Sequence, residues 1–489
     1  MAKGYIPVQR DQLFLVPPDM RDWLGKDHFV WWLLEVVARL NTKELHKLRR
    51  RGAQGRAGYD PEMLLALLLY AYTHKVRSSR EIERLCETDV AFRAICAGNT
   101  PDHSTIARFR QDHARLCQEL FAQVLELCAL AGLAQVGVVA LDGTKVAANA
   151  SKGANRSRAQ LEAEHARLEA EIAEMFAQAQ ALDDDEGQRF GPRRGDELPA
   201  GLAGAEARKA ALDRAMAALA EREAGHRSAR HPERWAARAE HFDKKLASAR
   251  QSWAARQAAK DPRGMKPRLP QGREVARLEA VVARNRAKAA AAAQVVNKAQ
   301  LNLTDPDSRL MTTPAGWAQA YNAQAVVNHV GIIVAAQVCS EPNDMAQFVP
   351  MLAALAEAGP IVGPIGVVLA DAGYCSATNL AAPGPTRLIA TKKSRLARAD
   401  RARAAGPAPE GLSPKAAMEH ALATPEGRHL YKQRSWTVEP CFGNLKHNLG
   451  FARFSRRGRP AAQAEWHFVT ALANLLKLFR YYPAAARLA

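Results

Sequence analysis

Two apolar, strand-like runs in this chain each finish on a single aspartate, and the two aspartates stand 229 positions apart (142 to 371). Residues 138–141 precede Asp142, and residues 367–370 precede Asp371. Packing does not explain the pattern, because burying an unpaired carboxylate costs free energy. Strand ends in α/β sheets are, however, where reactive groups are displayed. The pattern therefore predicts a sheet that brings both aspartates to one edge.

A third acid, Glu439, lies in a basic, helix-like segment, residues 431–440. We expect a helix after Arg434, with Thr437 as its cap and Pro440 in its first turn. Each acid taken alone is more often a helix cap or a surface charge. Their joint occurrence, in an order that fits a sheet, favours a site for hard divalent cations. Two such ions about 4 Å apart can activate the attacking oxygen and stabilise the leaving oxygen of an in-line displacement. The three acids therefore predict a magnesium site for phosphodiester chemistry.

The charge of the chain indicates what it binds. The net charge is +19 and the isoelectric point is about 9.8, and an excess of positive charge favours nucleic acid partners through counterion release. Charge alone does not separate DNA from RNA or from an anionic membrane surface. No apolar run approaches the roughly 20 residues that span a bilayer, and the N-terminus lacks a secretory signal. The seven cysteines are scattered without a Cys-x-x-Cys pair, which favours a reducing cytoplasm.

Residues 1–135 are predicted to form a helical N-terminal domain. Helices are expected over residues 27–40, 60–75 and 103–133, and Ser78 to Glu81 has the spacing of a capping box. Arg108 and Arg110 lie near the start of the last helix. Short helices joined by tight turns, with arginines at the start of the last one, indicate a helix-turn-helix-like DNA reader. The alternative is a plain helical bundle with solvated arginines.

Residues 154–300 are predicted to be a helical or coiled-coil insertion. Leu161, Leu168, Met175 and Leu182 recur every seven residues, which favours long antiparallel helices. Breaks at residues 191–195 and 261–264 are expected to be turns. Such an arm either dimerises or clamps DNA, and we expect dimerisation.

Residues 136–153 and 301–489 are predicted to form the catalytic domain. Strands are expected over residues 136–144, 366–371 and 386–390, and a hairpin over residues 319–338. A helix over residues 343–358 and a final amphipathic helix complete the pattern. The fold class is therefore α/β, with a ribonuclease H-like mixed sheet whose first and second strands are separated by the insertion.

Three segments resemble the acidic blocks of bacterial insertion-sequence DDE transposases: residues 141–145, 369–374 and 431–446. The last block is similar to the Tyr-Arg-Glu-Lys signature of that group, with Tyr431, Arg434, Glu439 and Lys446 matching by type. Four residues separate Arg434 from Glu439 where three are expected. The resemblance also includes residues 78–83, 102–105, 109–110, 304–309 and 321–324.

The resemblance implies excision and reinsertion of a DNA element. The N-terminal domain would bind the terminal inverted repeats. Asp142, Asp371 and Glu439 would be the catalytic residues and the ligands of two Mg²⁺ ions, with Mn²⁺ as a substitute. They would first hydrolyse one strand at the element end and then drive the freed 3′-hydroxyl into target DNA. The predicted DNA contacts are Tyr431, Arg434, Lys446, Lys145, Arg108, Arg110, Lys392 and Lys393.

The expected partner is double-stranded DNA, both element ends and target, bound by a homodimer in the nucleoid-associated cytoplasm and not at a membrane. Asn149 and Asn322 are expected to donate hydrogen bonds from behind the acids. Two alternatives stay open. One is a nuclease on the same sheet that cuts without joining, and the other is a domesticated DNA-binding protein. Three retained acids count against a protein that only binds.

Overall fold

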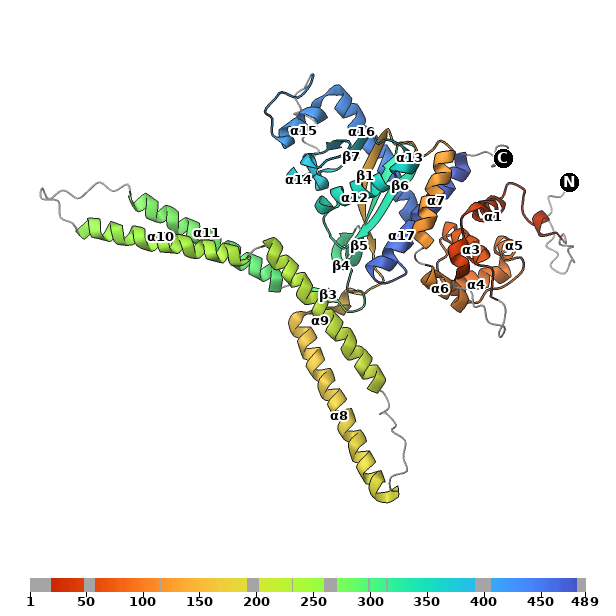
Figure 1. Cartoon of the computed structure of the whole chain (residues 1–489), viewed down its shortest axis with the longest axis horizontal. Helices are drawn as coiled ribbons and strands as arrows, with labels where there is room; N and C mark the ends of the chain where they lie inside the picture. Colours follow the sequence, from red (N-terminus) through yellow and green to blue (C-terminus); the bar gives the residue numbers. More distant parts are fainter. Residues whose placement is uncertain are drawn as a thin grey trace, which may run out of the picture. The chain divides into compact units, whose positions relative to one another are not determined.

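The computed structural model describes residues 19–47, 58–113, 116–190, 202–230, 232–258, 271–297, 300–313, 315–391 and 406–481. It falls into two compact units. The first combines residues 1–149 with residues 307–489, and the second comprises residues 150–306. Figure 1 shows the elements of both units along the chain. No described helix is long and apolar enough to cross a membrane.

The N-terminal part of the first unit is helical. Its α-helices are α1 (Phe29–Arg39), α2 (Lys43–Lys47), α3 (Pro61–Thr73), α4 (Ser79–Thr88), α5 (Val90–Ile95), α6 (His103–Asp112) and α7 (Leu116–Leu130). Asp60 accepts a hydrogen bond from the amide of Glu62 and Pro61 opens the helix, so the predicted start of α3 is confirmed.

Two local predictions in this region are wrong. Within the described residues, the side chain of Ser78 makes no capping hydrogen bond. Glu81 pairs instead with Arg84 one turn further on, so the capping box does not form. The helix expected over residues 103–133 is two helices, because α6 ends at Asp112 and α7 begins at Leu116.

A six-stranded mixed sheet follows, with the order β4-β5-β1-β7-β8 and β6 paired to β5. The strands are β1 (Val138–Ala147), β4 (Arg309–Thr313), β5 (Gly316–Asn328), β6 (Ile333–Cys339), β7 (Val367–Ala370) and β8 (Thr386–Ile389). β1 is antiparallel to β5 and parallel to β7. The predicted hairpin and the ribonuclease H-like mixed sheet are confirmed, and the first strand, β1, lies inside the sheet between β5 and β7. β4, which lies on the far side of β5, was not predicted.

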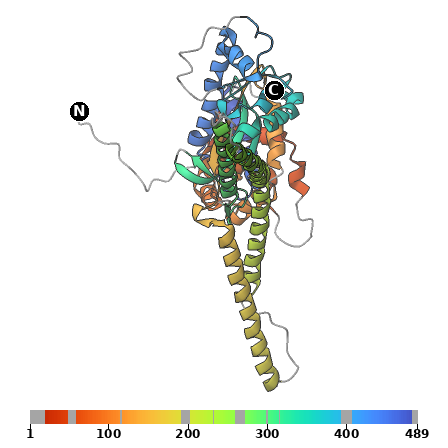
Figure 2. The same cartoon turned by 90° about the vertical axis from the view of Figure 1, so that its left-hand side faces the viewer.

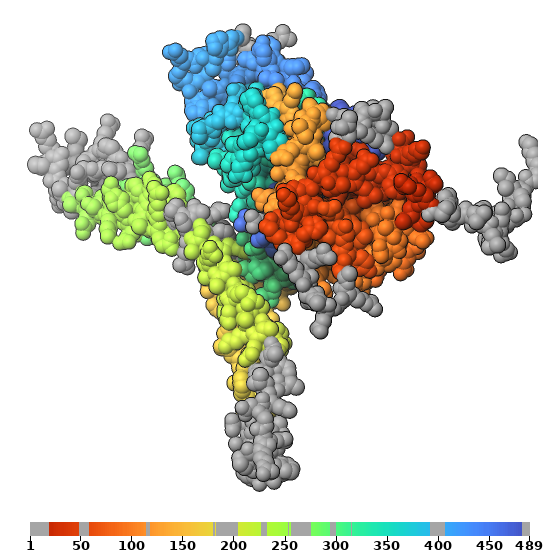
Figure 3. All heavy atoms as spheres, turned by 45° about the vertical axis from the view of Figure 1, so that its right-hand side comes forward, coloured from red at the N-terminus to blue at the C-terminus, as the bar shows by residue number. Residues whose placement is uncertain are grey.

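Helices cover the sheet. They are α12 (Phe348–Glu357), α13 (Gly359–Val362), α14 (Ala377–Ala381), α15 (Pro414–Ala423), α16 (Pro425–Gly443), a π-turn (Asn444–Asn448) and α17 (Arg459–Tyr481). Helix α16 packs on β1, β5 and β7, whereas α12 and α17 pack along β6. Helix α17 also contacts α3 and α7, so the N-terminal helices and the sheet belong to one continuous body (Figure 3).

The helix that carries Glu439 starts earlier than predicted. Thr424 caps it and Pro425 opens it, so its first turn lies well before Arg434. Thr437, which was expected to be the cap, is buried inside the helix and donates to the carbonyl of Gln433. Pro440 lies in the helix interior rather than in its first turn.

In its described residues the second unit has four long helices, α8 (Arg158–Phe190), α9 (Leu202–Arg230), α10 (Pro232–Ala258) and α11 (Gln271–Asn297). Figure 2 shows α8 and α9 side by side. Leu161 and Leu168 of the predicted seven-residue seam are buried against Leu212 and Leu219 of α9, which confirms the long-helix packing. The predicted turns at residues 191–195 and 261–264 lie outside the described residues. The short strands β2 (Asn155–Ser157) and β3 (Gln300–Asn302) of the second unit pair with each other.

Candidate active site

Asp142 and Asp371 lie side by side. β1 and β7 pair in parallel, and the last pair in the register is Leu141 with Ala370. Asp142 and Asp371 each follow directly after that pair, so they are neighbours across the two strands. The sequence suggested that Asp142 ends its strand, but it does not. β7 stops at Ala370, but β1 continues to Ala147 because β5 pairs with it over that length. Asp142 therefore stands at the point where the sheet loses one neighbouring strand.

The two carboxyl groups have different surroundings. The side chain of Asp142 is only 18% exposed, and burial raises its pKa to about 6, with help from the nearby charges of Asp371 and Asp344 and against the effect of Arg434. The carboxylate of Asp371 accepts a hydrogen bond from the amide of Gly373 at 2.8 Å and so caps the turn after β7. The Asp142 carboxyl therefore holds its proton at a higher pH than a solvated aspartate does.

Arg434 joins the first and third acids. Its Nη2 is 2.6 Å from Oδ2 of Asp142, and its Nη1 is 3.3 Å from Oε1 of Glu439. The Arg434 side chain is 15% exposed and that of Glu439 is 56% exposed. Although burial opposes it, the surrounding carboxylates hold the pKa of Arg434 above its ordinary value. One guanidinium thus bridges an acid of the sheet and an acid of α16.

The donor set can be compared with what a divalent cation requires. Among the described residues, no three acidic, histidine or cysteine side chains lie close enough together to hold a metal ion. The carboxylates of Asp142 and Glu439 nevertheless both pair with one guanidinium, that of Arg434. Carboxylate oxygens are the ligands that Mg²⁺ prefers, so the residues fit a hard cation if the guanidinium withdraws.

A fourth acid, Asp344, lies behind this site and was missed in the sequence. Its Oδ1 accepts from Nδ2 of Asn322 at 2.7 Å, Nε2 of Gln324 at 2.9 Å and Nζ of Lys145 at 3.2 Å. The available signal was Asn322 and Gln324, two of the four buried amide side chains of β5, since buried amides need polar partners. Asn322 had been expected to donate behind the acids, and its partner is Asp344. Asn149 instead donates to the carbonyl of Ser455.

Four predicted DNA contacts lie around the acids. Besides Arg434, the half-buried Tyr431 precedes it by one turn of α16. Lys446 lies in the π-turn and its Nζ donates to the carbonyl of Lys145 at 3.1 Å. Burial and the charge of Lys145 lower the pKa of Lys446. The two lysines therefore bring positive charge close to the end of β1.

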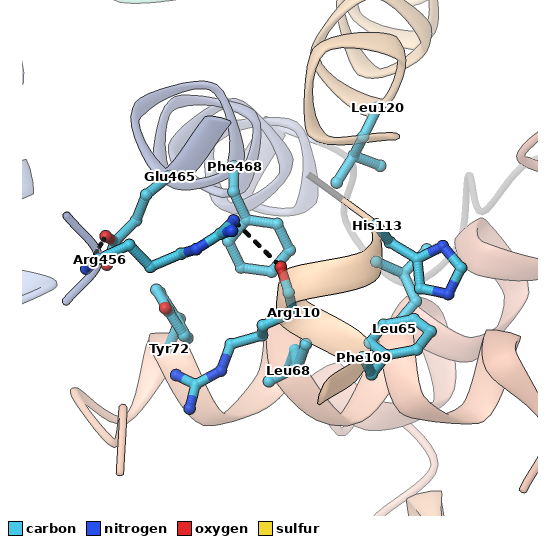
Figure 4. A pocket seen from close by; sticks show the side chains of 10 residues that line it. All are labelled: Leu65, Leu68, Tyr72, Phe109, Arg110, His113, Leu120, Arg456, Glu465 and Phe468. Carbon is cyan, nitrogen blue, oxygen red and sulfur yellow. Dashed lines mark hydrogen bonds between the residues drawn. The ribbon is translucent and has the colours of Figure 1, made fainter. Parts of the chain in front are cut away.

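The other predicted contacts are apart from this group. Arg108 is exposed on α6. The guanidinium of Arg110 donates to the carbonyl of Arg77 at 2.7 Å, and the carbonyl of Arg110 accepts from Arg456 at 3.1 Å. Figure 4 shows Arg110 and Arg456 beside the apolar cavity between α3, α6 and α17. Arg110 thus makes hydrogen bonds to Arg77 and Arg456 of the protein itself. Lys392 and Lys393 lie outside the described residues.

Comparison with protein families defines the class of protein. Residues 18–112 match a transposase domain (DUF772), and residues 303–475 match a transposase DDE domain. Together these regions cover more than half of the 489 residues, and the mixed α/β fold is consistent with the same class, the DDE transposases. No curated protein and no solved structure is similar enough to match the chain.

The chain belongs to the DDE transposase family of insertion sequences, whose members generally use divalent metal ions. Strand β1, with Asp142, lies outside both matched regions, because the second unit separates it from the rest of the sheet. The pairing of β1 between β5 and β7 puts it back into the centre of the matched domain. The match to the Tyr-Arg-Glu-Lys signature stays a prediction.

Proposed function

We propose that this transposase cleaves DNA at the ends of its element and joins the freed ends to target DNA, with Asp142, Asp371 and Glu439 as ligands of two divalent ions. The observation that carries the proposal is that the guanidinium of Arg434 pairs with both Asp142 and Glu439, while Asp371 directly follows the adjoining strand β7. A pure DNA-binding protein gains nothing from a desolvated carboxylate facing a phosphate-rich ligand, since such a charge is costly to bury and repels the ligand.

The residues of the chain would divide the work as follows. Asp142, Asp371 and Glu439 would hold Mg²⁺, which when bound activates the attacking oxygen and stabilises the leaving oxygen. Arg434 would leave its two carboxylates and bind a phosphate of the DNA, because planar guanidinium groups suit phosphate oxygens. Its charge would then neutralise the scissile strand while the ions neutralise the acids.

DNA would be held on both sides of this site. Lys446, Lys145 and Tyr431 would contact the backbone next to the scissile phosphate, together with Lys392 and Lys393. The exposed Arg108 of α6, with Arg110, would contact the element ends. We propose that two copies act together in the nucleoid-associated DNA complex, since an element has two ends, and that the helices of the second unit hold the copies together.

A cleavage and joining assay tests the proposal. Duplexes carrying the DNA that flanks the coding region would be incubated with the full chain and Mg²⁺. Asp142→Asn, Asp371→Asn and Glu439→Gln should abolish cleavage and keep specific binding, whereas Glu357→Gln, which changes an exposed acid on α12, should cleave normally. Joining of precleaved ends that carry a 3′-hydroxyl separates a transposase from a nuclease. Binding without cleavage by the unmodified protein would refute the catalytic proposal.

A further inference from the structure

The face of β1 opposite α16 carries a second row of polar side chains. Neighbouring residues of a strand point to opposite faces. Asp142 points to Arg434 on α16, so Gly143 and Lys145 face the other way. In register with them on β5 stand Gln324, opposite Gly143, and Asn322, opposite Lys145. Asn322 and Gln324 are fully buried.

Asp344 is the acid around which this row is arranged. It follows β6 and immediately precedes a short 3-10 turn, Met345–Gln347. One of its oxygens accepts all three donors, from Lys145, Asn322 and Gln324. The side chains of Lys145 and Asp344 are 19% and 23% exposed. A charge this far from water persists in a fold only with such partners, so the cluster fixes the place of Asp344 closely.

The same carboxylate contacts the segments that carry both aspartates of the site. A Cβ on Gly143, the residue after Asp142, would lie 2.6 Å from Oδ1 of Asp344. A Cβ on Gly373, whose amide donates to the capping carboxylate of Asp371, would lie 3.5 Å from Oδ2 of Asp344. Tyr374, the next residue, donates its hydroxyl to Gln324. Asp344 thus lies between β1 and the turn after β7, and at Gly143 only glycine leaves room for it.

We propose that Asp344 is a positioning residue of the transposase site. By tying β1 and β5 to the turn after β7, it keeps Asp142 and Asp371 at the spacing that divalent ions require. The inference rests on the proposed function, because it concerns the same ion site. Asp344 acts through Gly143, Gly373 and Lys145 and makes no contact of its own with DNA or ion in this role.

The test measures ion binding as well as cleavage. Mn²⁺ binding to the DNA-free full chain would be followed by the loss of the free-ion electron paramagnetic resonance signal. Asp344→Asn keeps the size of the side chain but removes the charge that pairs with Lys145. We expect Mn²⁺ affinity to fall about tenfold, the half-saturating Mg²⁺ concentration for cleavage to rise about tenfold, and the affinity for end DNA to stay within about twofold.

Two further variants sharpen the comparison. Gly143→Ala should reproduce the loss from the other side, because the new methyl would collide with Nε2 of Gln324 at 2.2 Å and with Asp344. The control is Glu341→Gln, which changes an exposed acid of the same turn. The backbone carbonyl of Glu341, which accepts from Asn322, is unaffected by that change. Both ion readouts should stay at the unmodified value.

The outcomes separate the two proposals. A merely structural role would reduce the amount of active protein and leave the Mn²⁺ affinity per folded chain unchanged, which would overturn the positioning role. If Asp344→Asn does not fold, Asp344→Asn combined with Lys145→Gln removes both charges of the pair and is measured in its place. Unchanged Mn²⁺ affinity in that folded variant would equally overturn the positioning role.

An unmodified chain that binds Mn²⁺ and cleaves, beside an Asp344→Asn chain that does the same, would refute the inference and leave the proposed function standing. An unmodified chain that binds no Mn²⁺ would refute both.

Discussion

The raised pKa of Asp142 predicts an unusual pH dependence of ion binding. Divalent ions bind the carboxylate, so a proton on Asp142 competes with them. With a pKa of about 6, about one Asp142 in ten is ionised at pH 5 in the ion-free protein, against nearly all at pH 7.5. Mn²⁺ affinity should therefore be nearly complete above about pH 7, about halved at pH 6 and about tenfold lower at pH 5, a loss of about 1.4 kcal/mol. A carboxyl group with the ordinary aspartate pKa would lose less than about 10% of its affinity over that interval.

Titration of the free Mn²⁺ resonance at pH 5 and pH 7.5 measures the effect on the DNA-free chain. Glu439→Gln is the matched control. Glu439 is not among the groups that shift the pKa of Asp142. The Glu439→Gln variant should therefore bind Mn²⁺ more weakly at both pH values and still show the tenfold ratio of affinities between pH 7.5 and pH 5. Equal affinities at pH 5 and pH 7.5 in the unmodified protein would refute the reasoning, because they would mean that Asp142 is solvated or is not a ligand.

Three further outcomes follow from single contacts. Arg108→Ala should weaken binding to end DNA and reduce the slope of log affinity against log salt by about 1, in filter-binding titrations at several salt concentrations. Gly366→Ala should lower the melting temperature, because its Cβ would lie 2.2 Å from the carbonyl of Gly137 at the start of the β1–β7 pairing. Leu168→Ala should destabilise the α8–α9 pair by about 2–5 kcal/mol, which circular dichroism melts would detect, since Leu168 is 2% exposed.

The sequence was sufficient for features that depend on local pattern. Apolar runs that end in an acid predicted β1 and β7, and Asp60 with Pro61 predicted the start of α3. The seven-residue spacing of leucines predicted the long helices of the second unit. In each case one local signal, either the hydrophobic period or a helix cap, is strong enough over a short stretch to decide the secondary structure there.

Features that depend on tertiary partners could not be predicted in this way. Nothing local to residue 344 marks it as part of the site, because its donors come from β1 and β5, and the nearer of these strands ends sixteen positions before it, at Asn328. Arg434 was expected to bind DNA, which stays a prediction, and its ion pairs with Asp142 and Glu439 could not be predicted. The start of α16 was misplaced because Thr437 and Pro440 imitate the start signal that Thr424 and Pro425 provide.

The site also depends on how the chain tolerates an insertion between its first and second acidic blocks. Loop closure entropy rises only slowly with length, by about 0.6 kcal/mol for each doubling. Even this cost is reduced here, because β2 pairs with β3 and joins residues 155–157 to residues 300–302 across the base of the second unit. The amide of Leu303 continues the clamp by donating to Ala154. Once β2 and β3 have paired, the chain segment before residue 155 and the one after residue 302 start close together. Strand β1 can then pair with β5 as if only a short loop joined them. A chain with this clamp broken should therefore lose pairing at β1, and with it Asp142, before it loses β7 and Asp371.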